Sequence, residues 1–312
     1  MNCPRFPASF RLLGLFACLM MGACSAAPPE ARSLLGSRLE RPLQDAQTKK
    51  AHLQALKAAR RTYKGEPSEE NGIQVGLALC SLGRVREAVF HYTGLLRRYP
   101  DSYRVRRHRG HRYITLRAFD KAEQDLSIAW GLCERYPDEA EHTAVPGATS
   151  SKPTGTDRTN ILYHLGLAQY FQGDFKSSLA TWELGLKVLG PEPLVASDDH
   201  RIAVSFWHRI TSARTESKSG FPASLVREDD NVTYNRAYHQ LCLLLSGRAE
   251  REGFPTNAQD PAEHSILLYG LARWHAEHDH ALESRLLLEH LIDSTPWTAF
   301  GHIAAEADLA RL

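Results

Sequence analysis

The sequence predicts an all-α protein, built as a solenoid of antiparallel helix pairs. Two observations lead to this prediction. Small residues recur at a fixed interval, since Gly76 and Gly110 are 34 positions apart, as are Ala88 and Ala122. Around these positions the apolar residues follow the 3.6-residue spacing of helices. Such a period is typical of helical repeat arrays, in which each pair buries its apolar face only by stacking on a neighbour.

The composition allows a globular core, and the net charge is too small to create a strong electrostatic field around the whole molecule. The chain has 312 residues, of which 43% are hydrophobic, and its formal net charge is only +2. A charge this small demands neither nucleic acid nor an anionic membrane surface as a partner, so local clusters of charge matter more than the sum. We expect no nucleic-acid partner, because the N-terminus predicts export.

The first 23 residues have the three parts of a secretory signal peptide. Arg5 and Arg11 supply positive charge, residues 12–21 form an apolar run, and Gly22 and Ala23 precede Cys24. The apolar run is about half of the roughly 20 residues that a membrane-spanning helix needs. Residues 1–23 are therefore expected to be removed rather than to remain as a transmembrane helix.

The four residues from Met21 to Cys24 also resemble the lipobox of bacterial lipoproteins. This resemblance implies cleavage before Cys24, attachment of acyl chains to Cys24, and anchoring to an envelope membrane. Ser25 follows, which by resemblance to enterobacterial sorting favours the outer membrane, with the protein in the periplasm or at the cell surface. Ordinary secretion with an incidental cysteine is the alternative.

The remaining chain divides into a flexible tether over 24–38 and one solenoid over 39–312. A helix is expected from about residue 40 to residue 64. Next come the clearest repeats, then degenerate helix pairs, and finally a last pair with a C-terminal capping helix. Their ranges are 69–102, 103–136 and 159–192 for the repeats, 193–262 for the degenerate pairs and 263–312 for the last pair and cap. A loop insertion rich in polar and acidic residues separates the second and third repeats at 137–158.

The repeats share a pattern of residues beyond the two small positions. Its members are Gly76, Gly83, Ala88 and Tyr92 in the first repeat, Gly110, Arg117, Ala122 and Leu126 in the second, and Gly166, Gly173, Ser178 and Trp182 in the third. This pattern resembles the tetratricopeptide repeat family, whose repeats pair two antiparallel helices. Segments 108–117 and 299–309 look like parts of uncharacterised bacterial tetratricopeptide proteins. The resemblance implies a helical scaffold and supplies no activity.

A basic cluster lies in the second repeat, where residues 97–112 contain seven arginines and one acid. In tetratricopeptide solenoids the first helix of each pair lines a concave groove, so the resemblance implies that Arg104, Arg107, His108 and His111 face that groove. Because the arginine fork matches carboxylate oxygens in pairs, we hypothesise that the groove binds an acidic peptide or polymer. The alternative is a solvated, salt-bridged helix face.

Aromatic residues of the third repeat add to this candidate surface. Tyr163, His164 and Tyr170 lie on its first helix, and aromatic anchors beside arginines suit peptide recognition. Packing between repeats is the alternative. The expected partner is another envelope protein or an acidic peptide; its identity and the oligomeric state stay open.

Catalytic patterns are absent from the sequence, and neither a cofactor nor a metal is expected. The turn at His275–His280 contains three histidines and an aspartate, but not the H-E-x-x-H spacing of metalloproteases. The predicted function is therefore a non-catalytic protein-interaction scaffold, anchored in the bacterial envelope. The alternative is a metal-dependent enzyme that uses the His275–His280 turn.

Overall fold

The computed structural model describes residues 28–141, 155–190, 198–215 and 225–312. Within these ranges the chain forms twelve helices and one small hairpin, and most helices pack against the next one in the chain. The helices are α1 (Ala46–Gly65), α2 (Glu69–Ser81), α3 (Val85–Arg98), α4 (Tyr103–Thr115), α5 (Phe119–Cys133), α6 (Asp157–Gln172), α7 (Phe175–Leu189), α8 (Asp199–Ser212), α9 (Arg236–Leu245), α10 (Pro261–Glu277), α11 (Ala281–Ser294) and α12 (Phe300–Leu309). The all-α class and the sequential helix pairs are confirmed.

Local signals in the sequence set the ends of these helices. The Ser102 hydroxyl accepts a hydrogen bond from the backbone N–H of Val105 and begins α4, as expected of an N-cap. Thr156 and Thr159 form a capping box at the start of α6, and Gly173 ends that helix with a left-handed φ of 87°. As a result, each of the first two predicted repeats contains one observed helix pair, and the third matches α6 and α7 except that α6 begins two residues before residue 159.

The three repeats share one packing arrangement at their small residues. A glycine on the first helix lies against a large side chain 16 residues later, on the second helix. The pairs are Gly76 with Tyr92, Gly110 with Leu126, and Gly166 with Trp182. A Cβ atom at any of these glycines would come within 2.7 Å of its partner side chain, closer than atoms pack. The fixed interval in the sequence therefore reflects equivalent close approaches of two helices.

The N-terminal segment differs from the prediction. We expected a flexible tether over 24–38, but residues 28–38 are folded, with β1 (Ala31–Arg32) antiparallel to β2 (Arg38–Leu39). The Glu30 carboxylate is buried, and it accepts hydrogen bonds from the Arg41 guanidinium and the Arg86 backbone N–H. These contacts fix the segment against the helices. Cys24 and the predicted signal peptide lie outside the described residues.

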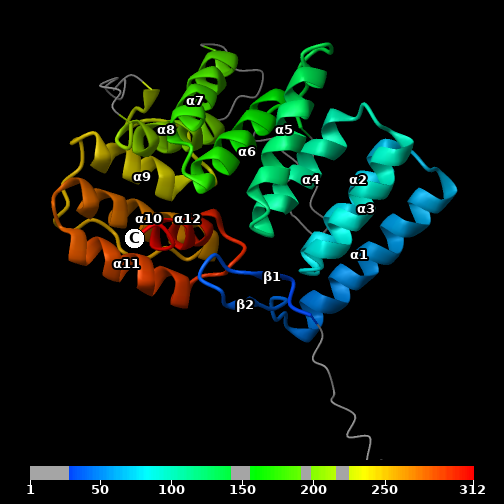
Figure 1. Ribbon diagram of the computed structural model, residues 1–312, viewed down its shortest axis with the longest axis horizontal. Helices are drawn as coiled ribbons and strands as arrows, with labels where there is room; N and C mark the ends of the chain where they lie inside the picture. The colour runs from blue at the N-terminus through cyan, green and yellow to red at the C-terminus, as the bar shows by residue number, and fades with distance from the viewer. Residues whose placement is uncertain (1–27, 142–154, 191–197, 216–224) are drawn as a thin grey trace, which may run out of the picture.

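The last helix also differs from its predicted role. We expected a C-terminal cap on an open end of the solenoid, but α12 packs against α6, α10 and α11. A Cβ atom at Gly301 would lie 2.3 Å from the Ser265 carbonyl oxygen, so this helix touches the backbone of α10. Residues 301–308 are all buried, which a helix at an open end would not achieve. In Figure 1, α12 lies inside the arch of helices rather than beyond its end.

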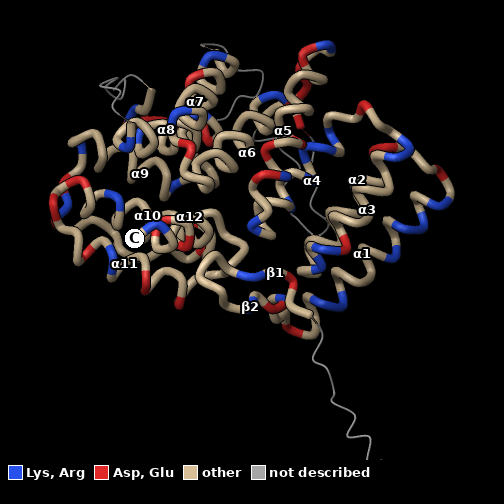
Figure 2. Tube along the Cα trace, in the orientation of Figure 1, with Lys and Arg blue, Asp and Glu red and all other residues tan. Residues whose placement is uncertain are grey.

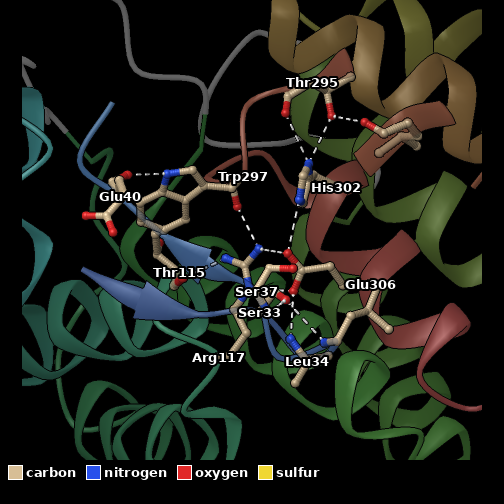
Figure 3. A network of polar contacts seen from close by, with 12 residues as sticks. Ser33, Leu34, Ser37, Glu40, Thr115, Arg117, Thr295, Trp297, His302 and Glu306 are labelled. Atoms are coloured by element: carbon tan, nitrogen blue, oxygen red, sulfur yellow. Dashed lines mark hydrogen bonds and ion pairs between the residues drawn. The ribbon is translucent and has the colours of Figure 1, made fainter. Parts of the chain in front are cut away.

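A polar network joins the N-terminal hairpin to α12 and closes the arch (Figure 3). The Arg117 guanidinium donates to both oxygens of the buried Glu306 carboxylate, at 2.6 and 3.0 Å. The same carboxylate accepts from the Leu34 backbone N–H, and it lies 3.0 Å from His302 Nε2. Burial raises the pKa of Glu306, but hydrogen bonds from His302 and Arg117 outweigh it and lower that pKa to about 2. Residues 272 positions apart are thus held together by one carboxylate.

Candidate functional site

The four predicted groove residues of α4 lie on one face of that helix, as spacings of three and four residues require. Arg104 is the most open of them, with 37% of its side chain exposed. Its Nε atom donates to Asp157 Oδ2 at 2.8 Å, and its Nη2 atom pairs with Glu139. The guanidinium also lies over the ring of Tyr103. Carboxylates of this chain therefore already neutralise Arg104.

Arg107 is buried beside it and is paired in the same way. Its Nη2 atom lies 2.8 Å from Glu141 Oε1, and its Nη1 atom lies 3.0 Å from His108 Nδ1. Because a guanidinium can only donate, His108 Nδ1 must accept, and that ring is neutral. Burial, followed by the charge of Arg107, holds the pKa of His108 well below its ordinary value. The His108 ring also stacks on Tyr92.

His111 and His164 meet across the boundary between α4 and α6, with ring centroids 4.2 Å apart. Phe300 at the start of α12 contacts both rings, at 5.4 and 5.9 Å. His164 Nδ1 lies 2.7 Å from the Asn160 carbonyl oxygen, to which it donates. Burial is the main reason why the pKa values of His111 and His164 fall well below the ordinary value. The structure thus brings these histidines together and covers them with α12.

The two predicted tyrosines pack between helices. Tyr170 is completely buried, and its hydroxyl lies 2.6 Å from that of Tyr269 on α10. Tyr163 is partly buried, and its hydroxyl lies 3.1 Å from that of Tyr238 on α9. Tyr170 has no surface that a partner docking from outside could touch. Its position agrees with the alternative given above, packing between repeats.

A cavity of about 190 Å³ remains beside Arg104. Its walls come from α2, α4, α6 and the described start of the insertion, at 139–141. The lining combines both charges with apolar surface: Glu70, Ile73, Tyr103, Arg104, Arg107, His108, Glu139, Ala140, Glu141, Asp157 and Ile161. Sequence reasoning placed the cations here and missed Glu139, Glu141 and Asp157. The acidic composition of the insertion was the available signal for them.

The His275–His280 turn lies at the end of α10. His275 Nδ1 and His280 Nδ1 are 3.3 Å apart, while the His278 ring stacks on Trp274 and donates from Nδ1 to its carbonyl oxygen. Within the described part of the chain, no three side chains among His, Cys, Asp and Glu converge closely enough to hold a metal ion. The turn therefore offers at most two facing imidazoles.

The same described ranges contain no helix with the length and apolar character needed to cross a membrane. A scan against models of protein families finds none that matches this chain, and a search of curated proteins finds no similar sequence.

Proposed function

We propose that this chain is a tetratricopeptide-type scaffold of the bacterial envelope that binds an acidic segment of another envelope protein at Arg104 and Arg107. The observation that carries the proposal is the pairing of both guanidiniums with carboxylates of the chain's own insertion. The pocket thus already holds groups with the chemistry of the proposed partner. The 34-residue interval and the three equivalent glycine contacts support the tetratricopeptide assignment.

At Arg104, a carboxylate of a partner can replace the carboxylate of Glu139 at a small cost in free energy. The Glu139 side chain is 62% exposed, and ion pairs of such exposed groups contribute about 0–1 kcal/mol. Asp157 is only 7% exposed, and it would keep Arg104 oriented while Glu139 moves away. An incoming acidic peptide would therefore compete with Glu139 rather than with the buried Asp157.

Binding of a fluorescent heptaglutamate peptide to the purified chain tests this site. Arg104→Gln should weaken binding about tenfold or more, because hydrogen bonds to charged groups are worth roughly 1.5–3 kcal/mol. Glu139→Gln should tighten it, since the internal competitor is removed. Arg97→Gln is the matched control, because Arg97 is exposed and lies outside the cavity. Equal affinities for all four proteins would remove the basis for the proposal.

Anchoring through Cys24 is the second part of the proposal, and its support is the lipobox-like sequence from Met21 to Cys24. Mass spectrometry of the protein from its native envelope should find a mature chain that begins at an acylated Cys24. An intact N-terminus or an unmodified Cys24 would exclude the anchor and leave the peptide site untouched.

A metal-dependent enzyme remains the second candidate, favoured by the facing nitrogens of His275 and His280. If this hypothesis is correct, elemental analysis should find one Zn²⁺ bound to the purified chain, and the His275→Ala variant should not bind it. Failure to retain zinc after dialysis against a zinc-containing buffer would remove this candidate.

A further inference from the structure

A strongly basic surface lies on α1, far from the cavity beside Arg104 in the chain. This 20-residue helix carries six lysines and arginines and no acidic residue. The cations are Lys49, Lys50, Lys57, Arg60, Arg61 and Lys64. Figure 2 shows them as blue segments repeated along α1, at the outer margin of the molecule. They span almost the whole helix, which is about 30 Å long at 1.5 Å per residue.

Helical periodicity gathers these cations into one stripe. At 3.6 residues per turn, all six fall within an arc of about 120° around the helix axis. Leu53 lies within the same arc, and it is 46% exposed. The packed face of the helix borders the stripe beyond Lys49, and there the buried Leu56 and the partly buried Tyr63 join an apolar cluster with α2 and α3. We call the six cations with Leu53 the α1 stripe.

The α1 stripe is not neutralised by the described part of the molecule. None of its six side chains forms an ion pair or a hydrogen bond with another described residue, whereas on α4 Arg104, Arg106, Arg107 and Arg109 all pair with carboxylates. Glu87 on α3 is within electrostatic reach of Arg60, but it already pairs with Arg84. Within the described residues, positive charge without a paired carboxylate therefore lies along α1, whereas the predicted groove cations Arg104 and Arg107 are paired.

An exposed aromatic side chain extends this surface. Phe90 on α3 is 81% exposed, and it lines a groove of about 650 Å³ together with Arg60 and Tyr63 of α1. Arg86 stands on the rim of the same groove. A large apolar side chain beside a row of cations is typical of surfaces that bind the membrane interface, where cations meet anionic headgroups and the apolar side chain enters the acyl boundary.

We propose that the α1 stripe and Phe90 form a docking surface for a bilayer that contains anionic phospholipids. Charge complementarity favours an anionic partner, and exposed Leu53 and Phe90 favour a lipid interface over a nucleic acid or an acidic polymer, which offer no hydrocarbon layer. The surface goes beyond the proposed peptide site and acts without the acyl chains of Cys24. With those chains present it would set which face of the molecule meets the membrane.

Sedimentation of the full chain carrying Cys24→Ser with lipid vesicles tests this surface. The protein should bind vesicles of phosphatidylcholine with phosphatidylglycerol more tightly than vesicles of phosphatidylcholine alone, and the difference should shrink as salt rises. Each cation near an anionic surface is worth about 1 kcal/mol, or about a factor of five. Lys50→Glu with Lys57→Glu should therefore weaken binding at least about 30-fold.

The control is Lys176→Glu with Lys187→Glu, two exposed lysines of α7 that give the same change in net charge. This pair should bind vesicles as the parent chain does. Phe90→Ala should weaken binding severalfold at every salt concentration, because it removes apolar contact and no charge. If Lys50→Glu with Lys57→Glu loses helical signal in circular dichroism, Lys50→Gln with Lys57→Gln replaces it, with an expected loss of about 30-fold.

Three outcomes would overturn the proposal. One is equal binding to vesicles with and without phosphatidylglycerol. Another is an equal loss in the α1 and α7 pairs, which would point to net charge alone. The third is tight binding of a single-stranded oligonucleotide or of heptaglutamate that depends on Lys50 and Lys57, without vesicle binding. Because the peptide site lies at Arg104, its variants leave this assay unchanged.

Discussion

At the scale of single residues, a glycine matters where it allows a large side chain of a neighbouring helix to lie against its backbone. Gly166 accepts the six-membered ring of Trp182, and a Cβ atom there would lie 2.6 Å from it. Gly185 on α7 is also helical, but a Cβ atom there would meet Val204 at 3.6 Å, an ordinary contact. The two glycines thus occupy helices for different reasons, and the same substitution should act in opposite directions.

Gly166→Ala should destabilise the protein by about 1–3 kcal/mol, the usual cost of inserting a methyl group into a packed core. Gly185→Ala should be neutral or stabilise it by up to about 1 kcal/mol, because alanine has the better helix propensity. Urea unfolding followed by circular dichroism measures both changes. Similar midpoints for the two variants would show that the Gly166 contact does not constrain the fold.

Arg117 occupies a position where the first and third repeats have glycine. Its φ is 61°, in the left-handed region, as are those of Gly83 and Gly173. The ion pair with Glu306 holds Arg117 in this conformation, since the two side chains are only 3% and 1% exposed. The second repeat therefore has an arginine in a turn where glycine would be unstrained, and this arginine links the repeat to Glu306 near the C-terminus.

Arg117→Ala should cost about 3–5 kcal/mol of stability, because it leaves the buried Glu306 without its guanidinium. Arg117→Gly should cost roughly 1–2 kcal/mol less than Arg117→Ala, since glycine tolerates the left-handed backbone. Thermal unfolding of both variants measures the difference. A less stable Arg117→Gly variant would contradict the strain argument.

At the scale of elements, the third repeat and α12 show that the pattern of one helix does not reveal which other helices pack on it. Tyr163 and Tyr170 carry helical spacing that fits a groove and a core equally well. Their packing inside the molecule follows from Tyr238 on α9 and Tyr269 on α10, whose hydroxyls meet theirs. A one-helix pattern cannot show which distant helix will cover it.

At Gly301, α12 lies directly against the backbone of α10. Gly301→Ala should destabilise the protein by about 3 kcal/mol, because the added Cβ atom would meet backbone rather than a movable side chain. The loss should exceed that of Gly166→Ala. Limited proteolysis should also cut the C-terminal segment sooner in this variant. Unchanged proteolysis together with an unchanged melting temperature would show that α12 tolerates a wider separation.

At the scale of the whole molecule, buried histidines link folding to pH. Burial is the main reason why the pKa values of His108, His164 and His200 lie below 6.5, and that of His200 falls to about 4. Because the folded pKa values are lower than the unfolded ones, the unfolded chain takes up these protons first as the pH falls. The contribution of these neutral histidines to the free energy of unfolding is complete above pH 6.5. It is lost as the pH falls from 6.5 to their pKa values in the folded protein.

The free energy of unfolding should therefore fall as the pH drops from 6.5 towards 4, by up to about 1.4 kcal/mol per pH unit for each histidine. Glu306, with its pKa near 2, withdraws its own contribution only below pH 4.5. Urea midpoints measured between pH 7 and 4.5 follow this loss. His164→Gln should flatten the profile, whereas the exposed His290→Gln should not. A flat profile in the parent chain would contradict the buried, neutral histidines.

The sequence by itself determined the helices, their pairing and the register of the repeats. These features depend on local periodicity, caps and the close approach of neighbours 16 residues apart, and all of them are encoded within one repeat. It also identified the α4 cations correctly as a cluster. The tertiary structure alone decided what covers that cluster, because Glu139, Glu141 and α12 reach it from other parts of the chain. Closure of the arch through Glu306 and the unpaired state of α1 likewise depend on which distant charges meet, and no local pattern carries that information.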